Sequence, residues 1–67
     1  MNINYIKKIF KNGTRVKLIH MNDDTPVPDG TLGTVDHVDD WVTVHVNWDN
    51  GRYLGVVLDE DDIEIID

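Results

Sequence analysis

The first residues of the chain repeat apolar positions with the period of a helix. The apolar residues at spacings of three and four are Ile3, Ile6, Ile9 and Phe10. This spacing puts them on one side of a helix over residues 3–11. Asn2 or Asn4 is a suitable N-cap, and Asn12-Gly13 supplies a left-handed residue to end the helix. Because a helix of about ten residues is marginally stable alone, its apolar side is expected to pack on the rest of the chain.

The alternation then changes to a period of two, which is typical of strands with one buried face. Residues 14–20 place Val16 and Leu18 on the same face. Residues 21–30 break this period and are rich in Asn, Asp, Pro and Gly. We therefore expect a first strand followed by a long loop.

A second strand is predicted over residues 32–38. Val35 and Val38 both face inward only if a β-bulge lies between them. Gly33 allows a bend in this strand or the close approach of another part of the chain. A tight reversal is expected at residues 39–40.

The clearest strand pattern lies at residues 42–48 and ends at the tripeptide Asp-Asn-Gly. Residues 49–51 fit a three-residue hairpin loop with a left-handed glycine. This loop pairs Val46 with Leu54 and Val44 with Val56. A two-residue Asn-Gly turn would move both partners to the opposite face, and such a slip is unfavourable when one face is buried. The valines therefore favour the three-residue loop.

The end of the chain completes a small sheet. Residues 59–62 are expected to form a single helical turn, and residues 63–66 a closing strand. Short strands with tight turns, in a chain too small for a sandwich, are typical of a small barrel. The predicted fold is mainly β: a small five-stranded SH3-like barrel over residues 13–67, preceded by a short basic amphipathic α-helix over residues 1–12, in a single domain.

Three segments carry a resemblance to known domains. They are Gly-Thr-Arg-Val at 13–16, Pro-Asp-Gly-Thr-Leu-Gly-Thr-Val at 28–35 and Val-His-Val-Asn-Trp-Asp-Asn-Gly at 44–51. The chain resembles a small family of domains of unknown function found in Gram-positive bacteria and their phages and mobile elements. The segments are similar, more loosely, to KOW-type and other SH3-like barrels. The resemblance covers about residues 12–66 and implies the fold, but it carries over no activity.

Size and composition limit the classes of protein. A chain of 67 residues buries only about 60% of its unfolded surface. Without cysteine it has neither disulfides nor thiolate metal ligands, so a reducing cytoplasm is the expected location. No apolar segment is long enough for a membrane span or a signal peptide, and we expect neither.

The charges are distributed unevenly. Residues 1–22 carry five basic and no acidic side chains, whereas residues 23–67 carry thirteen acidic side chains and one basic. The net charges of the two segments are therefore +5 and −12. The favoured interpretation is that helix and barrel attract each other, while the excess acid keeps the domain in solution. The alternatives are a basic arm that contacts an acidic partner, or an acidic face that imitates nucleic acid.

Candidate chemistry is sparse. The chain has no serine and no cysteine, and its threonines lie in no nucleophile motif, so we do not expect an enzyme. The densest potential metal cluster is Asp36, His37, Asp39 and Asp40. Its spacing matches neither a zinc nor a calcium site. We interpret it as a solvated turn and expect no metal and no cofactor.

The first functional hypothesis is a non-catalytic protein-interaction module. Trp41 lies at a predicted turn, and exposed aromatic residues anchor protein interfaces. The candidate contact residues are Trp41, Tyr53, Asp39, Asp40, Asp59, Glu60, Asp61 and Asp62. The module would be an accessory or inhibitory factor of a phage or mobile element, and its partner could be a basic, nucleic-acid-binding protein. Its oligomeric state is left open.

The second hypothesis is direct binding of RNA or DNA. The candidate residues are Lys7, Lys8, Lys11, Arg15 and Lys17, with Tyr5, Trp48 or Tyr53 for base stacking. The net charge of −7 opposes it, because contacts with phosphates dominate such affinity. Trp48 is instead expected to cover the barrel core.

Overall fold

Helix α1 (Ile3–Ile9) forms from the apolar repeat at the start of the chain. The computed structural model describes residues 2–66. Asn2 is the N-cap, and its side-chain oxygen accepts a hydrogen bond from the backbone N–H of Tyr5 at 3.1 Å. The helix ends at Phe10, before the predicted glycine, where the backbone leaves helical geometry and the ring is buried. Gly13 is left-handed (φ 92°), but it lies in the turn that leads to the first strand.

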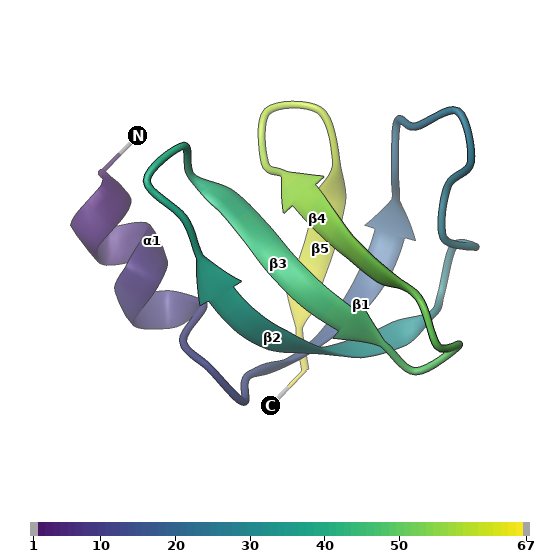
Figure 1. Cartoon of the computed structure of the whole chain (residues 1–67), viewed down its shortest axis with the longest axis horizontal. Coiled ribbons are helices and arrows are strands. Elements are labelled where there is room, and N and C mark those ends of the chain that lie inside the picture. Colours follow the sequence, from purple (N-terminus) through teal and green to yellow (C-terminus); the bar gives the residue numbers. More distant parts are fainter. Residues whose placement is uncertain (1, 67) are drawn as a thin grey trace.

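The strands form one antiparallel sheet. They are β1 (Arg15–His20), β2 (Leu32–Val38), β3 (Thr43–Trp48), β4 (Tyr53–Val57) and β5 (Asp62–Ile65). Their order in the sheet is β4-β3-β2-β1-β5. In Figure 1, β2, β3 and β4 lie in front of β1 and β5, and α1 lies at one end beside β2. The predicted mainly β class with one N-terminal helix is confirmed.

Two details of register follow the sequence prediction. The β3–β4 hairpin pairs Val46 with Leu54 and Val44 with Val56, as the three-residue loop requires. The β2–β3 ladder has an irregularity between Val35 and His37, which is the predicted bulge. The bulge allows the valines on both sides of it to face the core.

Two boundaries differ from the prediction. Strand β3 begins at Thr43, because Val42 has a left-handed backbone (φ 63°) and belongs to the preceding turn. The turn before β5 comprises residues 58–60, earlier than predicted, and Asp62 already pairs with His20 in the sheet. The backbone oxygen of Val57 closes this turn by accepting hydrogen bonds from the N–H groups of residues 60 and 61.

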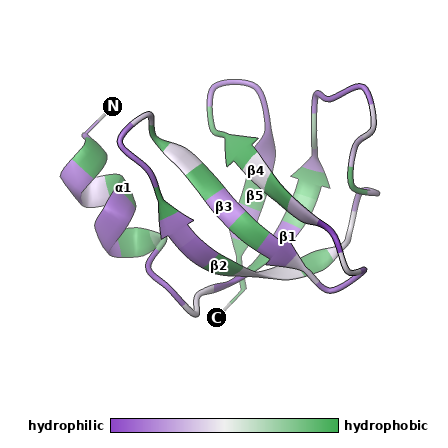
Figure 2. Cartoon of the chain, in the orientation of Figure 1, coloured by the Kyte–Doolittle hydropathy of each residue, from purple (hydrophilic) through white to green (hydrophobic). Residues whose placement is uncertain are grey.

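The core lies between the folded halves of the sheet and under α1. Its buried apolar residues are Ile6, Phe10, Val16, Leu18, Met21, Val27, Val35, Val38, Val44, Val46, Trp48 and Val56. Figure 2 shows the matching alternation of hydrophobic and hydrophilic positions along the strands. Trp48 is 3% exposed, as predicted, and its indole N–H donates to the backbone oxygen of Leu54 at 3.1 Å. A Cβ at Gly33 would lie 2.7 Å from Cε3 of Trp48, so this glycine makes room for the indole.

None of the helices in the described part of the chain is long and apolar enough to cross a membrane.

Candidate functional site

The turn between β2 and β3 has the same design as the turn between β3 and β4. In the first, the N–H of Val42 donates to Asp39 O at 3.1 Å, and the N–H of Asp39 donates to Thr43 O at 3.1 Å. In the second, Gly51 takes the place of Val42 and is also left-handed (φ 92°). Glycine adopts this backbone freely, but for other residues it costs about 1–2 kcal/mol. The first turn is therefore strained at Val42.

Asp39 holds this strained turn in place. Its Oδ1 accepts hydrogen bonds from the backbone N–H groups of Trp41 (2.9 Å) and Thr43 (3.0 Å). Its Oδ2 lies 2.8 Å from Nε2 of His45, which donates because an ionised carboxylate only accepts. The hydrogen bond from His45, with those from Thr43 and Trp41, holds the pKa of Asp39 below its ordinary value. Asp39, predicted to contact a partner, thus has a structural task in the turn.

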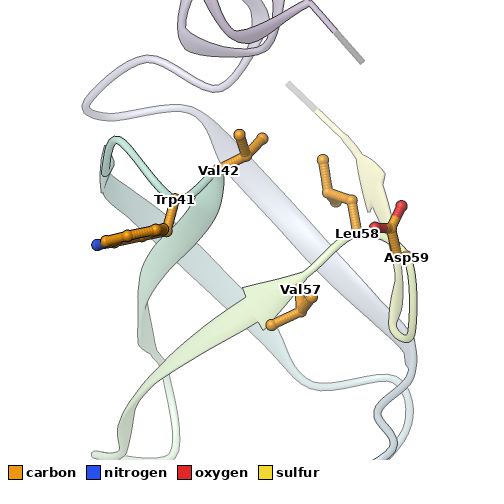
Figure 3. A pocket seen from close by; sticks show the side chains of 5 residues that line it. All are labelled: Trp41, Val42, Val57, Leu58 and Asp59. Carbon is orange, nitrogen blue, oxygen red and sulfur yellow. The ribbon is translucent and has the colours of Figure 1, made fainter.

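The turn presents Trp41 to solvent. Its side chain is 88% exposed, the largest exposure among the large hydrophobic residues of the described chain. A shallow pocket lies beside it, between this turn and the end of β4 (Figure 3). Trp41 and Val42 line one side, and Val57, Leu58 and Asp59 line the other. The structure therefore combines the suspected tryptophan with an apolar surface and one carboxylate.

The predicted acidic residues differ in their surroundings. Asp40 is exposed and forms an ion pair of 2.9 Å with Nζ of Lys7. Asp59 and Glu60 are exposed on the turn after β4, and Asp62 is exposed at the start of β5. Only Asp59 lines the pocket beside Trp41.

Asp61 was predicted to contact a partner, but it is buried. It is 6% exposed, and its carboxylate accepts hydrogen bonds from the backbone N–H groups of Asn22 (2.8 Å) and Val57 (3.0 Å). It thereby ties the long loop after β1 to the end of β4. A carboxylate buried in this way is not available to a partner.

Tyr53 lies in a separate row of rings on the outer face of β2, β3 and β4. The rings of His37 and His45 are stacked with centroids 4.4 Å apart, and Tyr53 follows at 6.0 Å from His45. Asp36 accepts hydrogen bonds from Nδ1 of His37 (2.8 Å) and the hydroxyl of Tyr53 (3.0 Å). These hydrogen bonds lower the pKa of Asp36, while desolvation and the bond to Asp36 raise the pKa of Tyr53.

Sequence reasoning missed this row. The β-bulge in β2 could have indicated it, because the position of the bulge sets the register that places His37 opposite His45. The hairpin register then places Gly55 opposite His45, and Tyr53 lies two residues before Gly55 on the same strand. The row lies at the start of β4, whereas the Trp41 pocket lies at its end.

The basic residues proposed for nucleic-acid binding lie on β1, on α1 and just after α1. Arg15 makes two hydrogen bonds to the Asp49 carboxylate (2.9 and 2.7 Å) and one to Oγ1 of Thr34 (2.8 Å). The hydrogen bonds from Arg15 lower the pKa of Asp49. Lys17 lies opposite Glu64 in the register of the β1–β5 ladder.

The remaining three lysines lie on the helix and just after it. Lys7 and Lys11 line a groove between α1 and β2. Lys7 also forms the ion pair with Asp40, which does not line this groove. Lys8 is exposed on α1. Carboxylates therefore accompany the basic side chains on several parts of the surface.

The potential metal cluster at residues 36–40 does not converge. Within residues 2–66, no group of three His, Cys, Asp or Glu side chains is close enough to hold a metal ion. Two of these carboxylates instead accept hydrogen bonds from histidines.

Comparison with known proteins gives one finding. The model of a family described as a domain of unknown function (DUF4314) matches residues 1–66. No curated protein and no solved structure matches the chain.

Proposed function

We propose that this chain, which belongs to the DUF4314 family of domains of unknown function, is a non-catalytic protein-interaction module whose contact surface is centred on Trp41. The observation that carries the proposal is the presentation of this side chain. Trp41 is 88% exposed and lies on a turn with a left-handed valine. Strained backbone persists where surrounding contacts impose it, and it gathers at functional positions. Tryptophan is also among the residues that dominate binding energy at interfaces.

The surroundings of Trp41 favour a basic partner. The chain carries a net charge of −7, and Asp59 and Glu60 are exposed near the pocket. A surface of this charge attracts cationic proteins and repels nucleic acid. We propose an accessory or inhibitory factor of a phage or mobile element that acts in the cytoplasm, on a partner that itself binds nucleic acid. The sheet order supports an SH3-like barrel as the scaffold.

Affinity capture with matched variants tests this function. The wild-type chain, Trp41→Ala and Tyr53→Ala are used as baits in a lysate of a Gram-positive bacterium. Ile19→Ala is the control, because Ile19 is also an exposed apolar side chain (45%) but lies on β1. We expect Trp41→Ala to lose a specific partner that Ile19→Ala retains. The proposal is wrong if Trp41→Ala keeps every partner that the wild-type chain binds.

Direct binding of RNA or DNA remains the rival function. It predicts salt-dependent retardation of nucleic acid that is lost when the five basic residues of the first segment are neutralised. The ion pairs of Lys7 with Asp40 and of Arg15 with Asp49 count against it, because they already use part of the positive charge. Absence of retardation at about 50 mM salt would remove this hypothesis.

A further inference from the structure

We propose that the pocket beside Trp41 binds a lysine or arginine side chain of the protein partner. This inference rests on the proposed function and specifies the chemistry that the surface recognises. It follows from the composition of the pocket, from the free carboxylate at its edge and from the way both sides of the pocket are held.

The pocket has the composition that a long cationic side chain requires. Val57, 40% exposed, and the partly buried Leu58 provide an apolar surface at the end of β4. Trp41 lies at one end of this surface, with its indole projecting away from it into solvent, and Asp59 lies at the opposite end (Figure 3). Lysine and arginine place their methylene groups on apolar surface and keep the charged end near water or a carboxylate. The face of a tryptophan ring also attracts a cation, and in the bound state the exposed Trp41 side chain would turn its ring toward the charged end of the ligand.

Asp59 is the carboxylate available to such a ligand. Within the described chain its side chain has no hydrogen bond and no ion pair, and it is the only charged residue that lines the pocket. Glu60, the next residue, does not line the pocket, and three other acids nearby are engaged elsewhere. Asp39 binds the turn, Asp40 pairs with Lys7, and Asp61 is buried against backbone N–H groups.

The same arrangement disfavours other ligands. An apolar side chain in the pocket would take water from Asp59 without replacing its hydrogen bonds, which is unfavourable. An acidic side chain would be repelled by Asp59 and by the net charge of −7. A cationic side chain avoids both costs.

Both sides of the pocket are fixed before binding. Asp39 fixes the turn that carries Trp41 through three hydrogen bonds. Asp61 fixes the other side, because its carboxylate binds the N–H of Val57 at 3.0 Å. A site that is already ordered loses less conformational entropy when a ligand binds.

A selection from random peptides displayed on phage, followed by affinity measurements, tests the inference. We expect the selected peptides to share a lysine or arginine. For a synthetic copy of one such peptide, Trp41→Ala should weaken binding at least about tenfold. Asp59→Asn should weaken it about two- to fivefold, as for an exposed ion pair. Replacement of the peptide lysine by norleucine should remove the effect of Asp59→Asn.

Glu60→Gln is the matched control, because it removes an exposed carboxylate one position away that does not line the pocket. The indole N–H resonance of the buried Trp48 verifies that each variant is folded. Selected peptides without basic residues that still need Trp41 would overturn this inference and leave the proposed function standing. Selection of no Trp41-dependent peptide would also overturn it, and the affinity capture above would then decide the proposed function separately.

Discussion

Asp39 and His45 are joined across the β2–β3 turn by a hydrogen bond of 2.8 Å between Oδ2 and Nε2. The other oxygen of the same carboxylate binds the backbone on both sides of Val42. One side chain therefore couples the outer face of β3 to the turn that exposes Trp41. The position of Trp41 at the candidate site therefore depends on Asp39, which does not line the pocket.

The first prediction concerns the ionisation of Asp39. Because the pKa of Asp39 is lowered from its ordinary value of 3.8, its charged form stabilises the folded state above that pH. This stability is lost as the pH falls below 3.8 through the lower pKa of the folded state. We expect Asp39→Asn to be less stable than the wild type at pH 7, with a difference that shrinks at about pH 3. Urea unfolding followed by tryptophan fluorescence measures both.

Asp24→Asn is the control for this experiment, since Asp24 is exposed in the long loop. It should leave the urea midpoint unchanged at both pH values. A difference between wild type and Asp39→Asn that is equal at pH 7 and pH 3 would contradict the role of the charge.

Much of the sheet could be predicted because local rules agree with one another. Gly51 and the alternating valines fix the β3–β4 register independently, and the structure has that register. The strand start at Val42 was wrong because Val42, Val44 and Val46 continue the same alternation in the sequence. A hydrogen bond from the N–H of Thr43 to the Asp39 carboxylate helps to hold Val42 in the turn, and the alternation of apolar residues does not indicate such a bond.

The second prediction concerns the strain at Val42. At a left-handed position alanine is less favourable than glycine by about 1 kcal/mol, whereas in a strand glycine is the less favourable of the two by about 0.5–1 kcal/mol. We therefore expect Val42→Gly to be more stable than Val42→Ala. The exposed strand residue Val57 should show the opposite order for the same two changes. Thermal unfolding of the four variants measures the difference in stability between glycine and alanine at each position. The same order of stability at both positions would rule out a strained backbone at Val42.

The third prediction concerns the close approach at Gly33. A Cβ there would lie 2.6 Å from Cγ1 of Val46 and 2.7 Å from Cε3 of Trp48, both buried in the core. Gly33→Ala should therefore lower the free energy of unfolding by about 1–3 kcal/mol, the range for an overpacked core. Gly55→Ala is the comparison, because its added Cβ meets only the end of the Thr43 side chain at this distance. Thr43 is half-buried and able to rotate, so this second change should cost clearly less. Equal losses in chemical denaturation would contradict the packing argument.

The candidate site was less predictable than the fold. Trp41 was found because an aromatic residue at a turn is unusual on a small acidic domain. The acids around it were not distinguishable, because residues 59–62 are four consecutive carboxylates in the sequence. Only the path of the long loop, which brings Asn22 to the end of β4, decides which of them is buried.

The last prediction separates two neighbouring carboxylates. Asp61→Asn keeps the size of the side chain, but an amide has one accepting oxygen where the carboxylate uses two, for the N–H groups of Asn22 and Val57. At least one buried N–H then loses its partner, at a cost of about 1–3 kcal/mol. Asp59→Asn makes the identical chemical change at an exposed position and should alter stability by less than about 0.5 kcal/mol. Urea unfolding at pH 7 compares the two, and hydrogen exchange of the Val57 amide should accelerate only in Asp61→Asn. Equal stability of the two variants would show that the Asp61 bonds do not hold the loop to the sheet.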